Sequence, residues 1–165
     1  MTEAPPVANF SGTPTSGNKP LTVQFTDGSS GSITSRSWTF GDGGTSSAQN
    51  PSHQYTSTGT YTVSLTVTGP GGTDTETKTG YITVSETPPV ADFSGTPTTG
   101  NRPLTVQFTD NSTNVTSRSW TFGDGGTSTQ LNPSHQYSST GTYTVTLTVT
   151  GLVAQIQRRR QDTLL

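Results

Sequence analysis

The chain has 165 residues, a net charge of −2, only 25% hydrophobic residues and no cysteine. The lack of cysteine excludes a disulfide framework, and this mildly acidic chain with few Lys residues does not favour nucleic-acid binding. No stretch is apolar enough for membrane insertion, and no signal peptide follows Met1, so we expect the chain to be a segment excised from a longer protein.

Alternating apolar residues predict strands in the first half of the chain. LTVQFTD (21–27) and TYTVSLTVT (60–68) alternate strictly, and SWTF (37–40) places Trp38 and Phe40 on one face. This period of two is typical of half-buried strands, whose exposed side tolerates β-branched Thr. Clusters such as GTPTSGNKP, GDGG and GPGG separate the strands as turns. Short strands with regular turns predict an all-β, antiparallel β-sandwich.

The same pattern then occurs a second time. Eighteen of 21 residues match between VANFSGTPTSGNKPLTVQFTD (7–27) and VADFSGTPTTGNRPLTVQFTD (90–110), at an offset of 83. After the loss of one residue the offset is 82, and RSWTFGDGGTS is identical at 36–46 and 118–128. A period this long exceeds the roughly 20–50 residues of solenoid repeats and suits independent domains.

We therefore predict two tandem sandwiches. The first covers residues 1–85, and a short linker at 86–89 is stiffened by Pro88 and Pro89. The second covers residues 90–157 and has an atypical last strand, and we expect residues 158–165 to form a disordered tail.

Each sandwich is expected to have its own small core. Ile82 is the doubtful member of the first core, because its parity opposes that of its neighbours. The predicted first core comprises Phe10, Leu21, Val23, Phe25, Trp38, Phe40, Tyr55, Tyr61, Val63, Leu65, Val67, Tyr81, Ile82 and Val84. The predicted second core comprises Phe93, Leu104, Val106, Phe108, Trp120, Phe122, Tyr137, Tyr143, Val145, Leu147 and Val149.

The tail after Gly151 departs from the repeat. One set of codons, beginning GGC CTG GTG GCA CAG ATA CAG, encodes residues 151–165 and, read without its first two nucleotides, spells PGGTDTETKTGYIT, the sequence of residues 70–83. Our hypothesis is that the tail is a one-nucleotide frameshift of the second repeat's own final strand, so that QRRRQ carries no selected chemistry. Sequencing the gene across the Gly151 codon tests this, and codons incompatible with the second reading would contradict it. We expect LVAQIQ, with Leu152, Ala154 and Ile156, to fill the exposed sheet edge as a makeshift strand.

The motif order WTFGDGG, NPSHQY, TGTYTVSLTVTG resembles the PKD (polycystic-kidney-disease) domain, and it covers residues 1–85 and again 88–151. The resemblance implies an immunoglobulin-like β-sandwich. The amino-acid sequence of the motifs is most similar to that of modules of archaeal and bacterial surface-layer proteins and secreted enzymes. It implies spacer, adhesive or accessory binding roles, not catalysis. The family often has Asp where Thr39 and Thr121 stand here, which removes a carboxylate that could bind calcium.

The repeated motif is predicted to be a structural corner of each sandwich. Trp38 and Phe40 face the core, and the turn that follows uses Gly for positive φ and Asp for bonds to its own loop. We expect the histidines to satisfy backbone groups near the Trp. The predicted corner residues are Trp38, Phe40, Gly41, Asp42, Gly43, His53 and Tyr61 in the first repeat, and Trp120, Phe122, Gly123, Asp124, Gly125, His135 and Tyr143 in the second.

Other chemistry is weighed against this structural interpretation. Ser52 and His53 are strand neighbours that point to opposite faces, which disfavours a hydrolase, and one His per domain disfavours zinc. No cofactor is expected, but calcium is the better metal candidate, because carboxylates near strand ends could converge. These candidates are Asp27, Asp42, Asp92, Asp110 and Asp124, with Asn9 in the place of Asp92 in the first repeat.

Three Asn-x-Ser/Thr sites, at Asn9, Asn111 and Asn114, would be glycosylation sites on an exported chain, and Asn9 is the weaker because it is expected in a strand. The leading functional prediction is a non-enzymatic extracellular or cell-surface module, a spacer, stalk or adhesion unit of a larger protein. The alternatives are an accessory module of a secreted hydrolase that binds polysaccharide or protein, and a self-associating unit of a filament or sheath.

Overall fold

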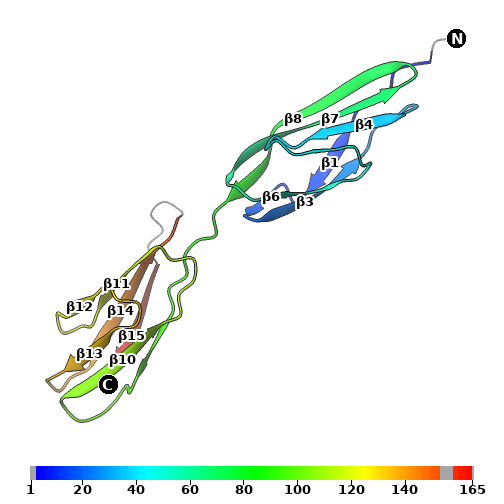
Figure 1. Ribbon diagram of the computed structural model, residues 1–165. Coiled ribbons are helices and arrows are strands. Elements are labelled where there is room, and N and C mark those ends of the chain that lie inside the picture. The colour runs from blue at the N-terminus through cyan, green and yellow to red at the C-terminus, as the bar shows by residue number, and fades with distance from the viewer. Residues whose placement is uncertain (1–2, 153–157, 165) are drawn as a thin grey trace. The chain divides into compact units, whose positions relative to one another are not determined.

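The computed structural model describes residues 3–152 and 158–164 and divides into two compact units, Met1–Glu86 and Thr87–Leu165 (Figure 1). Each unit stacks one sheet on another. Every element in the described ranges is a strand, so none of them is a helix of membrane-spanning length. The predicted all-β class with tandem sandwiches is confirmed.

The first unit pairs a sheet of order β1-β3-β6 with a sheet of order β2-β8-β7-β4-β5. Its strands are β1 (Phe10–Thr13), β2 (Ser16–Asn18), β3 (Leu21–Asp27), β4 (Ser35–Thr39), β5 (Thr45–Ser46), β6 (Ser52–Tyr55), β7 (Gly59–Gly69) and β8 (Gly72–Ser85). All of these pairs are antiparallel except β2 with β8, which is parallel. The final strand β8 therefore lies between β7 and the short strand β2.

The second unit repeats this arrangement up to its last strand. Its strands are β9 (Phe93–Thr96), β10 (Leu104–Asp110), β11 (Ser117–Thr121), β12 (Thr127–Ser128), β13 (Ser134–Tyr137), β14 (Tyr143–Thr150) and β15 (Arg158–Leu164). The sheets have orders β9-β10-β13 and β12-β11-β14-β15. Within the described part of this unit, no strand corresponds to β2.

The predicted cores are confirmed almost residue for residue. Sequence analysis missed Ala8, while Tyr61, Tyr81, Leu104 and Tyr143 are partly buried against their cores. The Tyr61 hydroxyl donates to the Ser57 carbonyl at 2.8 Å, and Tyr143 does the same to Ser139 at 3.0 Å. This bond from a tyrosine to the backbone a few residues upstream is a recurrent feature of immunoglobulin-like sandwiches.

Ile82 is fully buried, which confirms the doubtful member of the predicted core, and an irregularity in β8 explains why its parity opposes that of Tyr81. The pairing of β7 with β8 shifts register between Tyr61 and Val63, where Gly80 adopts a φ of 62°. Tyr61 lies opposite Ile82 and Val63 opposite Lys78, so β8 has two extra residues there, and Ile82 keeps the inward parity of Lys78 and Val84. Tyr81 lies within the irregularity, and its ring meets Phe10 edge-on at 5.7 Å.

Side chains of β8 cover the outer edge of β1. Asp74 and Glu76 accept hydrogen bonds from the backbone amides of residues 8 and 10 at 2.8 and 3.0 Å, and the Tyr81 hydroxyl accepts one from the amide of residue 12 at 2.9 Å. Lys78 donates to the Phe10 carbonyl and lies over the Phe10 ring. An edge strand whose amides are bonded in this way offers fewer groups for pairing with another chain.

The disordered tail predicted for residues 158–165 is wrong for Arg158–Leu164, which form β15. This strand pairs antiparallel with β14, from Val149 opposite Arg158 to Tyr143 opposite Leu164. Unpaired backbone groups on the outer side of β14 favour any segment that can reach them, whatever its side chains. The predicted makeshift strand of Leu152, Ala154 and Ile156 falls mostly on 153–157, outside the described residues.

Candidate functional site

The repeated motif forms the turn that leaves β4, as predicted. Gly41 and Gly43 have φ values of 85° and 94°, and the Phe40 amide donates to the Gly44 carbonyl at 3.1 Å. The Asp42 carboxylate accepts a hydrogen bond from the Gly44 amide at 2.9 Å. A Cβ on Gly41 would lie 2.5 Å from the Thr62 carbonyl oxygen, so both the backbone conformation and the packing require glycine there.

The polar atoms of the buried aromatic side chains around this turn are bonded to backbone. Trp38 is fully buried, and its indole donates to the Ala48 carbonyl at 2.9 Å. The Tyr55 hydroxyl donates to the Phe40 carbonyl at 3.0 Å, and burial raises the pKa of this hydroxyl. These bonds join β4, β6 and the intervening loop into one structural corner. Trp120 and Tyr137 repeat them in the second domain, where burial raises the Tyr137 pKa to about 12.

A His–Asp pair lies at the outside of the corner. His53 Nε2 is 2.7 Å from Asp42 Oδ2, and its ring stacks on Phe40 with centroids 4.2 Å apart. Burial opposes ionisation of Asp42, but hydrogen bonds from His53 and the Gly44 amide outweigh it and hold the Asp42 pKa below its usual value. The prediction that His53 bonds a backbone group is wrong, because its Nε2 pairs with the Asp42 carboxylate.

The second domain repeats this pair without change. His135 Nε2 is 2.7 Å from Asp124 Oδ2, and its ring stacks on Phe122 at 4.1 Å. The prediction that His135 bonds backbone is therefore wrong for the same reason. Again burial opposes ionisation of Asp124, and the bonds from His135 and Gly126 lower its pKa. A contact reproduced this closely in two domains is part of the fold of each.

The arrangement does not assemble a nucleophile. Ser52 is exposed, whereas its neighbour His53 is half-buried with Nε2 engaged by Asp42. Adjacent strand residues face opposite ways, so the Ser52 hydroxyl is directed away from the imidazole that would have to accept its proton. The opposite-face prediction made for this pair from the sequence matches their burial.

The calcium candidates are distributed between separate corners. Asp27 and Asp110, at the ends of β3 and β10, each bind an arginine, with Arg36 Nε at 2.5 Å and Arg118 Nε at 2.7 Å. Burial opposes ionisation of both carboxyls, but bonds from the following serine and from the arginine lower their pKa.

The remaining candidates do not complete a ligand set in the described residues. Asp42 and Asp124 bind the histidines, and the Asp92 backbone exchanges hydrogen bonds with the Ser112 hydroxyl at 3.0 and 3.1 Å. No group of three or more His, Cys, Asp or Glu residues was found in the part of the chain that the structure describes. Calcium binding stays a prediction, for which melting with calcium and with chelator is the test.

All three glycosylation candidates are exposed. Asn9 precedes β1 rather than lying within a strand, which corrects the sequence-based placement. Asn111 and Asn114 lie in the loop between β10 and β11, where Asn114 adopts a φ of 58° and its amide donates to the Pro88 carbonyl at 3.3 Å. Glycosylation itself stays a prediction.

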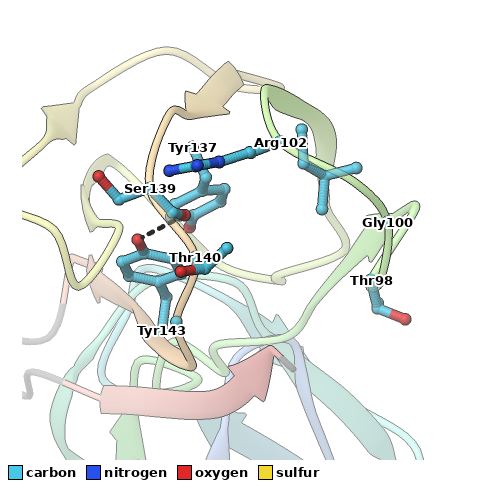
Figure 2. Close-up of a pocket in the computed structure, with 9 residues that line it drawn as sticks. Thr98, Gly100, Arg102, Tyr137, Ser139, Thr140 and Tyr143 are labelled. Atoms are coloured by element: carbon cyan, nitrogen blue, oxygen red, sulfur yellow. Dashed lines mark hydrogen bonds between the residues drawn. The ribbon is translucent and has the colours of Figure 1, made fainter.

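Sequence analysis missed a pocket in the second domain. It has a volume of about 200 Å³ and lies between the segment before β10 and the loop joining β13 to β14 (Figure 2). Its lining comprises Thr98, Gly100, Arg102, Leu104, Tyr137, Ser139, Thr140, Gly141 and Tyr143. The sequence signal that could have located this pocket is the difference between the two repeats after Gly69 and Gly151.

The two stacked-sheet units, each with its tyrosine bond and buried tryptophan corner, define a tandem pair of immunoglobulin-like modules. Comparison with known families identifies them further. The PKD domain family matches residues 3–84 and 86–162, and the chain belongs to this family. The resemblance stated from the sequence motifs is confirmed.

Similar proteins include two bacterial collagenases. Collagenase ColA of Bacillus cereus is 40% identical over 86 residues, which are 50% of this chain and 9% of that protein. Microbial collagenase of Vibrio alginolyticus is 55% identical over 42 residues, which are 26% of this chain and 5% of that protein. The chain thus spans only a small part of the curated relatives it matches.

Solved structures include the PKD1 domain of the Vibrio cholerae metalloprotease PrtV, which is 40% identical, with 51% of this chain and 99% of that one covered and a TM-score of 0.42. The titin domains z1z2, in complex with telethonin, align over 99% of this chain and 95% of theirs with a TM-score of 0.57. At 17% identity the titin pair shares only the fold.

Proposed function

We propose that the chain is a non-catalytic accessory module of a larger extracellular enzyme that acts on a fibrous protein. The observation that carries this proposal is that the ionisable side chains of each corner are bonded to one another. The same bonds occur in both domains. Asp42 and His53 hold a turn, and Asp27 and Arg36 hold a strand end. The collagenase and metalloprotease relatives support an accessory role beside a protein-degrading domain.

A polysaccharide ligand is less favoured by the placement of the aromatic residues. Every Trp, Tyr and Phe of the chain lies in one of the two cores or packs against it. Sugar-binding platforms of the kind considered from the sequence need a flat, exposed aromatic strip. We therefore give precedence to a protein ligand, recognised through the polar strand faces and loops.

A spacer or adhesive stalk is the second candidate function. Tandem repetition supports it, because each unit has its own core and a short segment with two prolines joins them. Such a chain would hold an attached domain at a distance without binding the substrate itself. Self-assembly into a filament is a further candidate, which sedimentation velocity at several concentrations tests.

Sedimentation of the whole chain with insoluble collagen fibres tests the accessory proposal, with microcrystalline cellulose as the matched control. We expect saturable loss of the chain from the supernatant with collagen and none with cellulose. Retention in the supernatant with both solids would contradict substrate binding and favour the spacer. Equal loss to both would indicate non-specific adsorption and also contradict it.

A further inference from the structure

Residues 85–90, which we call the joining segment, connect the two domains. β8 ends at Ser85, the first unit ends at Glu86, and the second unit begins at Thr87. Thr87 is exposed, and no hydrogen bond or ion pair to it was found among the residues that the structure describes. The contacts on its two sides therefore determine how much of the joining segment is free to move.

The first domain holds the start of the joining segment. The Lys19 amide donates to the Ser85 carbonyl at 2.9 Å, and the Lys19 ammonium forms an ion pair with the Glu86 carboxylate at 2.5 Å. The Lys19 and Glu86 side chains are 34% and 22% exposed, so solvent screens this ion pair only in part. The main chain up to residue 86 is therefore fixed to the first domain.

The second domain holds the other end of the joining segment. The Val90 amide donates to the Thr113 carbonyl, and the Thr113 amide donates to the Val90 carbonyl, both at 3.0 Å. Pro89 is buried, and a Cβ on Gly151 would lie 2.9 Å from the Pro89 Cδ, so the proline ring packs closely on the chain at that glycine. The main chain from residue 89 onward is therefore fixed to the second domain.

The first domain shows that this packing is internal to one domain. Its leading segment PPVANF matches PPVADF of the second domain, with Pro6 in the place of Pro89 and Val7 in the place of Val90. Pro6 is also buried, and Val7 exchanges the same two backbone bonds with Ser30, both at 2.9 Å. The segment thus packs on the domain that follows it in the sequence.

A side-chain bond to the joining segment has no counterpart in the first domain. The Asn114 side-chain amide donates to the Pro88 carbonyl at 3.3 Å, and Asn114 has a φ of 58°. The equivalent residue of the first domain is Gly31, with a φ of 94°. Asn tolerates a positive φ better than most residues and, unlike Gly, supplies a side-chain donor. The second domain therefore adds a bond directly after Thr87.

We propose that the joint between the two domains is a single residue, Thr87, and that Lys19 and Asn114 confine the joint to it by holding the residues on either side. Because a proline follows, Thr87 is itself restricted to extended conformations, which removes further freedom. The joining segment is then a coupling of fixed length and not a flexible tether. This inference applies to an accessory module and to a spacer alike, so it does not depend on either proposed function.

Relaxation of the backbone ¹⁵N nuclei of the full chain tests the proposal. The amides of Ser85, Glu86 and Val90 should have order parameters of about 0.85, the value typical of rigid backbone, and the Thr87 amide should have a lower one. Values below about 0.6 at Glu86 and Val90 as well would overturn the proposal, because the whole segment would then be flexible. A Thr87 value as high as those of its neighbours would also overturn it, because no joint would then lie at this residue.

Variants on each side of Thr87 test the two confining residues. K19E should increase the population of released Glu86 about threefold and lower the order parameter of its amide, and K19E combined with E86K should restore it. N114G, which introduces the residue of the first domain, should increase the mobility of the Pro88 carbonyl in ¹³C relaxation. R102E, at the position equivalent to Lys19 in the second domain, is the matched control and should leave residues 85–90 unchanged. Unchanged relaxation in K19E and N114G, or an equal change in R102E, would overturn the proposal.

Discussion

The two domains differ most in their last strands. In the first, a tight turn pairs Gly69 with Gly72, and β8 continues for 14 residues until it reaches β2. In the second, β14 and β15 pair from Val149 opposite Arg158, and β15 has seven residues. Because the preceding strands are nearly identical, the comparison shows that the corner and the core form independently of how the sheet is closed.

Restoring the last strand should have the largest effect. Replacing residues 152–165 by the sequence of residues 70–86 is expected to raise the free energy of unfolding of the second domain by about 3 kcal/mol or more, since it buries two further aliphatic side chains. Urea unfolding of both chains measures this difference. The same replacement with Asp in place of both aliphatic residues is the control, and an equal gain from it would contradict the explanation.

Truncating the buried side chain of Ile82 should have the next largest effect. Ile82→Ala is expected to destabilise the first domain by roughly 3 kcal/mol, because the fully buried side chain leaves a cavity. Thermal unfolding by calorimetry would show the shift in one of two transitions. Val7→Ala, at a side chain 58% exposed, should change stability by less than about 0.5 kcal/mol. Equal effects of the two variants would contradict the assignment of Ile82 to the core.

The His–Asp pair should contribute equally in the two domains. Asp42→Asn and Asp124→Asn are each expected to destabilise their own domain by about 1.5 kcal/mol at neutral pH, because a hydrogen bond to a charged group is lost. Both carboxyls have lowered pKa values in the folded state. Their contribution is therefore present above the unfolded pKa and is lost as pH falls through the folded value.

Urea unfolding of each variant and of the original chain as a function of pH checks this sign. The difference in stability should be constant near neutral pH and should shrink as the pH falls below about 4. A difference that grows on acidification would contradict the role of the carboxylate. Unequal effects in the two domains would indicate that the His–Asp pair, despite the same geometry, contributes differently to the free energy of unfolding of each domain.

The smallest effect should come from Lys19, whose ammonium pairs with Glu86 just after β8. Lys19→Glu is expected to destabilise the first domain by about 0.5 kcal/mol, because its ion pair with Glu86 is partly exposed. Arg102→Glu should not destabilise the second domain, since no described carboxylate pairs with Arg102. Urea unfolding compares the two variants, and equal losses would show that Arg102 already has an ionic partner.

Much of this structure followed from local sequence pattern. Alternation located the buried faces of β3 and β7, and the glycines of GDGG indicated the turn, because both signals depend on nearby residues. Ile82 was only the doubtful member of the predicted core, since the irregularity beside Tyr61 depends on how two strands pair. Nor did the pairing of His53 with Asp42, since β6 brings the histidine back to a turn formed eleven residues earlier.

The second domain shows a further limit of structure prediction from sequence pattern. The tail pattern predicted disorder for residues 158–165, yet Arg158–Leu164 form β15. Backbone pairing requires only that a segment reach the edge in an extended form, so the apolar pattern of a tail does not determine its register when one face is not committed to a core.

The bonds between β8 and the edge of β1 also bear on how a repeated protein is synthesised. β1 is the first strand of its domain to leave the ribosome, and β8 is the last. Adjacent domains with similar sequences can exchange equivalent strands during folding. The carboxylates of Asp74 and Glu76 bond the amides of residues 8 and 10 only when both ends of one domain come together. Completion of the first domain is thus coupled to the arrival of its own final strand, which favours correct partnering when a similar domain is synthesised after it.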